Sequence, residues 1–233
     1  MYSKDYYQCF REGPGIAGGY DQVPTYLRNR LAEMARRCGP GSLLDLGCAT
    51  GLFVAYARSQ GWNAVGVETS SWAASEGRKR FGVEIFECPL EDVPIAPATF
   101  DVVHANHVLE HVADPVGTLR SAFRLLRPGG LLYVEVPQEL KQPLADWIVA
   151  LRHPRQPTAF APNYHLLYFS KRGLLLAARR AGFEMESLRN LRHTEDLKKR
   201  PLPLDVARRL IYRLEAGVQR APLYVLTARR PKE

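Results

Sequence analysis

LLDLGCATGLF, residues 43–53, is an apolar run that passes directly into a turn containing two glycines. The run has the length and composition of a buried strand, and Gly47 and Gly51 stand at Gly-x-x-x-Gly spacing. In an open parallel sheet, the turn after the first strand lies at the carboxyl edge, where ligands bind. The stretch therefore predicts a strand, a ligand-binding turn and a helix after it.

Apolar segments alternate with helical patterns along most of the remaining chain. The segments rich in Val and Leu have strand length, and most are followed by apolar residues at helical spacing. This alternation is typical of a parallel sheet that helices cover on both faces. We expect strands at 42–47, 63–68, 82–88, 99–105, 130–136, 183–189 and 223–229, and helices at 24–37, 53–61, 70–82, 115–126, 145–151, 170–182 and 208–218.

The composition is that of an ordinary globular protein. The 233 residues are 46% hydrophobic and 24% charged, which allows a substantial core. The four cysteines form no Cys-x-x-Cys pair, so we expect reduced thiols and no structural zinc. The start of the chain has no signal-peptide core, and no run approaches the ~18 apolar residues of a membrane span. We therefore expect a cytoplasmic protein without a transmembrane segment.

The chain is basic, with a formal net charge of +8 and a pI near 9.5. Such a charge is compatible with an anionic partner such as nucleic acid. Within 208–218, however, the arginines alternate with apolar residues at helical spacing, which indicates an amphipathic helix with a solvated face. Nucleic acid is therefore a partner that we do not expect.

The chemistry of the turn is indicated by Asp45, two residues before Gly47. A dinucleotide motif would carry a glycine at Ala49, and a carboxylate beside the turn would repel a pyrophosphate. An ammonium or sulfonium group would be attracted instead. Glu68 follows the second strand about 20 residues further on, where an acidic side chain binds ribose hydroxyls. A cationic tail and a ribose together describe S-adenosylmethionine, although a turn without a ligand is the alternative.

Several motifs resemble, in order and spacing, those of the class I S-adenosylmethionine-dependent methyltransferases. They are LLDLGCATG, VGVETS, PLEDVPIAPATFDVVHANHVLEHVADP and LRPGGLLYVEVP, which together cover residues 41–137, and YHLLYFSKRGLLLAARRAGFE is similar to the tail segment. The branch that they resemble includes the ubiquinone-biosynthesis type and many bacterial small-molecule enzymes. The resemblance implies a Rossmann-like α/β three-layer sandwich, with a seven-stranded, mostly parallel sheet and an antiparallel last strand.

The resemblance also implies which residues bind the cofactor. Asp45 and the turn would hold the methionine part, Glu68 the ribose, and Leu90 and Glu91 the adenine. Many relatives carry an aspartate where this chain has Pro89, so we expect the adenine amino group to contact Glu91 or the backbone instead. The full expected set is Asp45, Gly47, Cys48, Ala49, Gly51, Phe53, Glu68, Thr69, Leu90, Glu91, Ala105 and Asn106.

Histidines are the candidate catalytic residues. Methyl transfer to a hydroxyl needs a group that removes its proton, and histidine suits that task near neutral pH. The candidates are His111, His107 and His165, each with the alternative of a purely structural role, whereas His104 is expected to be structural. His107 and His111 would share a face if their stretch were helical, but the HExxH motif is absent and no further ligand is evident, so we expect no metal.

A single methyltransferase domain is expected across 1–233. Within it we expect an N-terminal cap and helix at 1–40, a cofactor-binding core at 41–137, and substrate-covering segments at 138–165 and 190–221. Prolines punctuate the first covering segment, which sets it apart from the alternating core.

The expected function is methyl transfer to a small molecule, with oxygen as the favoured acceptor atom. Basic residues of the covering segments suit an anionic acceptor, namely Arg152, Arg155, Lys198, Lys199 and Arg200. The aromatic residues Trp147, Phe160 and Tyr164 suit an aromatic or lipid-like acceptor. An RNA methyltransferase is the second hypothesis, although the sequence HANH stands where base-amine enzymes carry an Asn/Asp-Pro-Pro-Tyr motif. A non-catalytic cofactor-binding protein is the third. The oligomeric state stays open.

Overall fold

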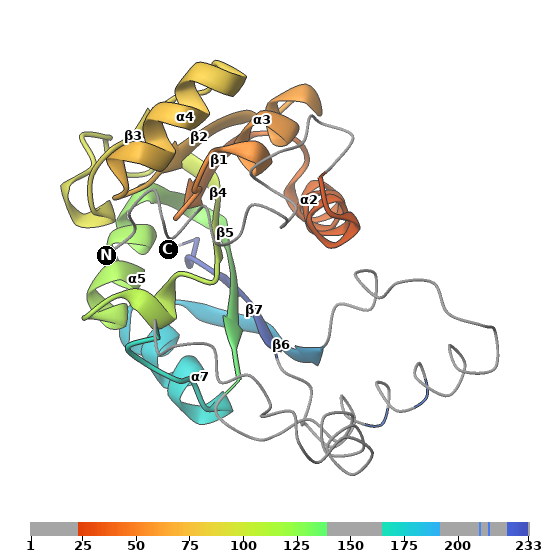
Figure 1. Ribbon diagram of the computed structural model, residues 1–233. Coiled ribbons are helices and arrows are strands. Elements are labelled where there is room, and N and C mark those ends of the chain that lie inside the picture. The colour runs from red at the N-terminus through yellow and green to blue at the C-terminus, as the bar shows by residue number, and fades with distance from the viewer. Residues whose placement is uncertain (1–22, 139–164, 192–209, 211–213, 215–222, 233) are drawn as a thin grey trace, which may run out of the picture.

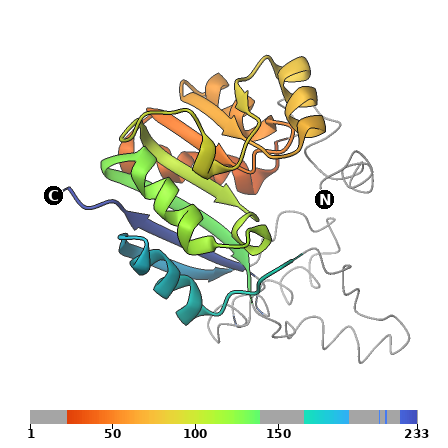
Figure 2. The same ribbon diagram turned by 90° about the vertical axis from the view of Figure 1, so that its left-hand side faces the viewer.

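The computed structural model describes residues 23–138, 165–191 and 223–232, together with residues 210 and 214. They form one seven-stranded sheet in the order β3-β2-β1-β4-β5-β7-β6, with helices on both faces (Figures 1 and 2). The expected three-layer, mostly parallel architecture is confirmed, because β7 alone runs antiparallel to its neighbours. The strands are β1 (Ser42–Leu46), β2 (Asn63–Val67), β3 (Ile85–Phe86), β4 (Phe100–Asn106), β5 (Leu126–Pro137), β6 (Glu184–Leu191) and β7 (Leu223–Arg229), and the helices are α2 (Thr25–Cys38), α3 (Leu52–Ser59), α4 (Ser71–Phe81), η2 (Leu90–Asp92), η3 (Leu109–His111), α5 (Pro115–Leu125) and α7 (Lys171–Arg180).

The order of the strands places the switch point of the sheet between β1 and β4. From β1 the chain moves outward to β2 and β3, and then returns to the other side of β1 to form β4 and β5. The loops after β1 and β4 therefore leave the sheet side by side and turn in opposite directions. In open α/β sheets, ligands bind in the crevice at this point.

Each face of the sheet has its own apolar core. Leu43 of β1 and Val102 of β4 belong to the cluster that packs against α2 and α3. Leu44 and Val103, the next residues along these strands, belong to the cluster that packs against α5 and α7. Alternate residues of a strand point to opposite faces, so both faces of β1 and β4 are buried. None of the described helices has the length and apolarity to cross a membrane.

Local differences from the predicted elements occur at their ends. The strand expected at 82–88 is reduced to Ile85–Phe86, because β3 is an edge strand that pairs with β2 at only two positions. Helix α4 begins after Ser70, whose hydroxyl accepts a hydrogen bond from the Ala73 amide. The helices expected at 145–151 and, except for two positions, at 208–218 lie outside the described residues.

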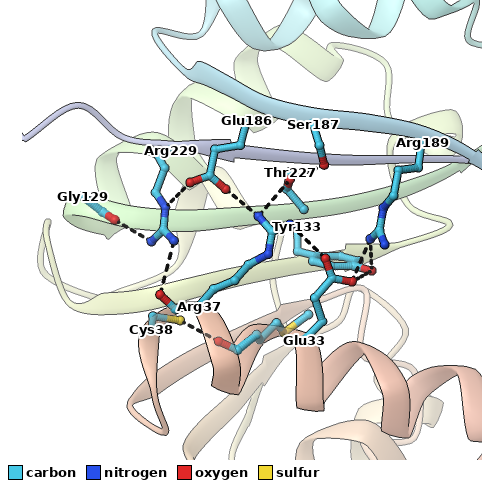
Figure 3. A network of polar contacts seen from close by, with 11 residues as sticks. Glu33, Arg37, Cys38, Gly129, Tyr133, Glu186, Ser187, Arg189, Thr227 and Arg229 are labelled. Carbon is cyan, nitrogen blue, oxygen red and sulfur yellow. Dashed lines mark hydrogen bonds and ion pairs between the residues drawn. The ribbon is translucent and has the colours of Figure 1, made fainter.

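Helix α2 is fastened to the far half of the sheet by charged side chains (Figure 3). Glu33 accepts hydrogen bonds from Arg189 of β6 at 2.7 Å, Arg37 at 3.0 Å and the Tyr133 hydroxyl of β5 at 3.2 Å. Arg37 also donates to Glu186 of β6 at 2.6 Å. The face of α2 that lies over β5 and β6 is therefore held by a polar network in addition to its apolar contacts.

Glu33→Gln should lower the free energy of unfolding by about 1–2 kcal/mol at neutral pH, because it removes a charge that three donors share. Burial raises the pKa of Glu33, but Arg189 and Arg37 outweigh it, and the net shift is below the ordinary value of 4.5. The stabilisation is therefore present above about pH 4.5 and is lost as the pH falls through the lowered pKa. Chemical denaturation should show that the difference in the free energy of unfolding between variant and wild type is smaller at pH 3 than at pH 7.

The matched control for this experiment is Glu84→Gln, a substitution of an exposed glutamate before β3. It should change the free energy of unfolding little at either pH. A Glu33 variant as stable as the wild type at pH 7 would contradict the structural role of the network.

Candidate functional site

Two adjoining cavities open at the switch point of the sheet. The wide cavity has a volume of about 370 Å³ and lies over the ends of β1, β2 and β4 toward η2 and η3. The narrow cavity, of about 150 Å³, lies over β1 and β4 toward α2 and α3. Gly47, Ala49 and Asn106 line both cavities, so the two are parts of one site.

The glycine turn requires its glycines for both conformation and space. Gly47 has φ +65° and Gly51 has φ +71°, values that residues with a side chain rarely adopt. A Cβ on Gly47 would lie 2.5 Å from a methyl carbon of Val108, which lines the wide cavity. Ala49 between them also has a positive φ, of 49°. The turn thus brings backbone close to both cavities.

Glu68 ties the glycine turn to the next helix. Its carboxylate accepts hydrogen bonds from the Ala49 amide at 2.9 Å and from the Ser70 amide at 2.8 Å. Burial raises the pKa of Glu68, whereas these amide hydrogen bonds oppose that shift. Glu68 and Thr69 both line the wide cavity, where a carboxylate is available to hydroxyl donors. The bracing of the turn is a role that the sequence analysis did not foresee.

Asp45 is paired with His104 rather than standing alone. The two residues are register partners on β1 and β4, and Nδ1 of His104 lies 2.7 Å from Oδ1 of Asp45. Both side chains are buried and line the narrow cavity together with Cys48 and Phe53. The rings of Phe53 and His104 lie with their centres 4.6 Å apart. His104, expected to be structural, therefore belongs to the site.

Residues of η2 and α5 line a second part of the wide cavity, apart from the glycine turn. Leu90 is buried there, and the Glu91 carboxylate accepts a hydrogen bond from the Thr118 hydroxyl at 2.7 Å. Cys88 and Pro89 complete this wall. Leu90 and Glu91 are among the residues predicted from the sequence, whereas no sequence signal indicates Thr118, which lies on α5, 27 residues after Glu91.

Asn106 lines both cavities, and Arg30 of α2 contacts its side chain. The Asn106 side-chain oxygen accepts a hydrogen bond from Arg30 at 2.7 Å. Arg30 is buried and also forms an ion pair with Glu135 of β5, which is fully buried. The polar network of α2 thus extends into the site. Ala105, the residue before Asn106, is buried in β4 and lines neither cavity.

His107 is held between two buried carboxylates. Its Nδ1 lies 3.1 Å from Glu110 and its Nε2 lies 3.3 Å from Glu135, while 39% of the side chain is exposed. Burial lowers the pKa of His107, but the hydrogen bonds and charges of Glu110 and Glu135 outweigh it and raise the pKa to about 9. His107 is therefore a cation at neutral pH.

His111 and His165 come together beside Glu110. His111 lines the wide cavity, and its ring centre lies 4.9 Å from that of His165. The carbonyl of Glu110 accepts hydrogen bonds from the amides of Leu166 and Leu167 at 2.8 and 3.1 Å, which brings His165 to this place. The ligand-type atoms of Glu110, His111 and His165 lie within 4.8 Å of one another. This is a geometry that could hold a metal ion, although the sequence analysis expects none.

Most of the residues expected to bind the cofactor lie on the two cavities. Gly51 and Ala105 are the exceptions, since Gly51 is the N-cap residue before α3 and Ala105 lies within β4. The ligand roles of all these residues stay predictions. Those that line a cavity are Asp45, Gly47, Cys48, Ala49, Phe53, Glu68, Thr69, Leu90, Glu91 and Asn106.

The site fits the chemistry of S-adenosylmethionine. Two buried carboxylates, Asp45 and Glu68, stand on either side of a turn whose residues Gly47 and Ala49 line both cavities. Buried anions favour a ligand with positive charge and hydroxyl donors, and they disfavour a pyrophosphate.

Comparisons with known proteins find methyltransferases among the similar chains. A probable S-adenosylmethionine-dependent methyltransferase of Mycolicibacterium smegmatis is 28% identical over 190 residues, which cover 81% of this chain and 68% of that protein. The malonyl-[acyl-carrier protein] O-methyltransferase of Serratia marcescens is 27% identical over 151 residues, 63% of this chain and 59% of that protein. Across several curated relatives, the chain spans 36% to 68% of the relative's own length.

A solved structure shows the same fold. The S-adenosylmethionine-dependent methyltransferase from Archaeoglobus fulgidus superposes with a TM-score of 0.66 at 18% identity, over 97% of this chain and all of that one. Residues 21–188 match the family model described as a methyltransferase domain. Because that match takes in most of the chain, the protein belongs to the class I S-adenosylmethionine-dependent methyltransferases, and S-adenosylmethionine is its cofactor.

Proposed function

We propose that this protein transfers a methyl group from S-adenosylmethionine to an oxygen atom of a small molecule. When bound, the cofactor supplies a methyl group on a sulfonium, which is already a good leaving group. The chain must therefore hold the acceptor in line and take the proton from its hydroxyl. The observation that carries the proposal is His111, which lines the wide cavity with the ring of His165 beside it.

Of the three candidate histidines, His111 is the one that we assign as the general base. It lines the wide cavity, so an acceptor placed there can reach its imidazole. The ring of His165 lies beside it. Burial, together with the charges of His111 and His107, lowers the pKa of His165 against the opposing effect of Glu110. A neutral His165 leaves the neighbouring imidazole free of a second positive charge.

His107 fits a different role. A base must be deprotonated before it can accept a proton, and the raised pKa keeps His107 protonated at neutral pH. Both of its nitrogens also face carboxylates, Glu110 and Glu135. We therefore assign His107 as a fixed cation that balances these two buried charges, and not as the base.

The choice of oxygen and of a small molecule has two supports. A histidine that can take a proton is useful for a hydroxyl acceptor, and one relative is named for methyl transfer to an oxygen, that of malonyl-[acyl-carrier protein]. Arg152, Arg155, Trp147, Phe160 and Tyr164, which suit an anionic or aromatic acceptor, lie outside the described residues. Cytoplasmic location and the division of the chain into core and covering segments also stay predictions.

His111→Asn should reduce the turnover number by roughly 100-fold or more, because proton removal from the acceptor is lost. Its affinity for S-adenosylhomocysteine should stay within about twofold of the wild type, since His111 is not among the residues that we assign to the cofactor. The assay measures S-adenosylhomocysteine release with phenols and hydroxy acids, and with amines and RNA as comparison acceptors. Turnover restricted to amines or RNA, or full activity of the variant with a hydroxyl acceptor, would refute the proposal.

His107→Gln should make stability less dependent on alkaline pH. A histidine whose pKa is 6.5 when unfolded and about 9 when folded adds stability in full below pH 6.5. This stabilisation is lost as the pH rises through about 9. The free energy of unfolding of the wild type should therefore fall over that range, whereas that of the variant should not. Denaturation curves between pH 6 and 10 measure the difference. His165→Gln is the matched control, because the lowered pKa of His165 makes its own effect run in the opposite direction.

Chelation should leave turnover unchanged, because the proposed reaction needs no metal. The measurement is S-adenosylhomocysteine release before and after dialysis against EDTA, with the divalent ions then added back singly. A loss of activity that one ion restores would reassign Glu110, His111 and His165 as metal ligands.

A further inference from the structure

Two neighbouring helices carry a strongly basic surface on the face of the sheet that α2 does not cover. Helices α5 and α7 pack side by side over this face (Figure 2). Neither helix contains an aspartate or a glutamate. The exposed charged residues of the two helices, which we call the basic face, are Arg120, Arg124, Lys171, Arg172, Arg179 and Arg180.

The cations of the basic face have no carboxylate partners. None of them forms an ion pair with a residue that the structure describes. Other arginines of the described chain do form such pairs with carboxylates, namely Arg37, Arg78, Arg127, Arg189 and Arg229. Like charges one helical turn apart, as in Arg120 and Arg124, repel each other. The basic face is therefore suited to an anionic partner outside the chain.

An exposed leucine lies among these charges. Leu176 of α7 is 49% exposed, with Arg172 one turn before it and Arg180 one turn after it. Tyr168, in the segment that leads into α7, is 38% exposed. The three residues of α7 thus form a stripe in which an apolar side chain stands between two cations.

This mixture of charge and exposed apolar surface favours a lipid bilayer as the partner. Cations alone would fit a nucleic acid equally well, because both partners carry phosphates. An apolar side chain gains free energy where it leaves water, as it does at the boundary between lipid headgroups and acyl chains. Protein interfaces have a core depleted of charged residues, whereas Leu176 has arginines on both sides.

We propose that the basic face docks the protein on the surface of an anionic lipid bilayer. Its cations contact the lipid phosphates, and Leu176 enters the boundary between headgroups and acyl chains. Arginine side chains are long enough to keep their guanidinium groups among the headgroups while the leucine lies deeper. The inference goes beyond the proposed function and does not depend on which atom accepts the methyl group.

Sedimentation with vesicles tests the proposal. The full chain is mixed with vesicles of phosphatidylcholine alone, or of phosphatidylcholine and phosphatidylglycerol in equal amounts. The wild type should bind the anionic vesicles and not the neutral ones, and binding should weaken as salt is added. Arg179→Gln combined with Arg180→Gln should lower the partition coefficient by roughly 10- to 30-fold, because two of the cations at the surface are lost.

Two further variants make the result specific. Leu176→Ala should lower binding to the anionic vesicles by roughly fivefold and leave binding to mixed-sequence RNA unchanged, because only the bilayer takes up the apolar side chain. The matched control is Arg36→Gln combined with Arg58→Gln, which removes two exposed arginines from α2 and α3 on the other face of the sheet. This control should bind the vesicles within about twofold of the wild type.

Several results would overturn the proposal. They are a wild type that does not bind anionic vesicles, a control variant that loses as much binding as the Arg179 and Arg180 variant, and a Leu176 variant that binds vesicles as the wild type does. RNA binding that depends on Arg179 and Arg180, without vesicle binding, would assign the basic face to nucleic acid instead.

The outcome is distinct from that of the turnover experiments. S-adenosylhomocysteine release with a hydroxyl acceptor, measured without vesicles, should be the same in the wild type and in the Arg179 and Arg180 variant. A protein that binds anionic vesicles but methylates no hydroxyl acceptor would refute the proposed function and support the docking surface. Turnover without vesicle binding would refute the docking surface alone.

Discussion

Burial of negative charge is the constraint that organises this site. Asp45, Glu68, Glu110 and Glu135 are all buried around the ends of β1, β2, β4 and β5. A buried carboxylate is costly unless hydrogen bonds or an opposite charge compensate it. Each of these four has a different compensation: an imidazole for Asp45, backbone amides for Glu68, His107 for Glu110, and both Arg30 and His107 for Glu135.

The same constraint connects the scaffold with the cavities. Arg30 reaches Glu135 and Asn106 from α2, and Glu33, one turn further along that helix, is held by β5 and β6. Helix α2 therefore has two structural roles. It covers one face of the sheet, and its Arg30 places a guanidinium next to Asn106, which lines both cavities. A displacement of α2 would expose Glu135 and release Asn106, so the polar network over β5 and β6 contributes to the geometry of ligand binding.

Much of the fold could be predicted from the sequence because its signals are local. The strand at 43–46, the turn after it and Glu68 at the end of the next strand follow from apolar runs, glycine spacing and a fixed interval. The pairing of Asp45 with His104 and the contact of His107 with Glu135 could not be predicted. Both depend on which strands become neighbours, and β4 joins β1 and β5 only in the folded sheet. The charge of His107 is a consequence of that topology.

The main-chain carbonyl of Glu110 accepts hydrogen bonds from the amides of two consecutive residues, Leu166 and Leu167. The place of His165 is thereby fixed by main-chain atoms, which every amino acid except proline supplies. The Leu166 side chain is 54% exposed, so it can be exchanged without disturbing this anchor. A substitution at Leu166 can therefore alter the protein surface at this point while the main-chain hydrogen bonds that place His165 are kept.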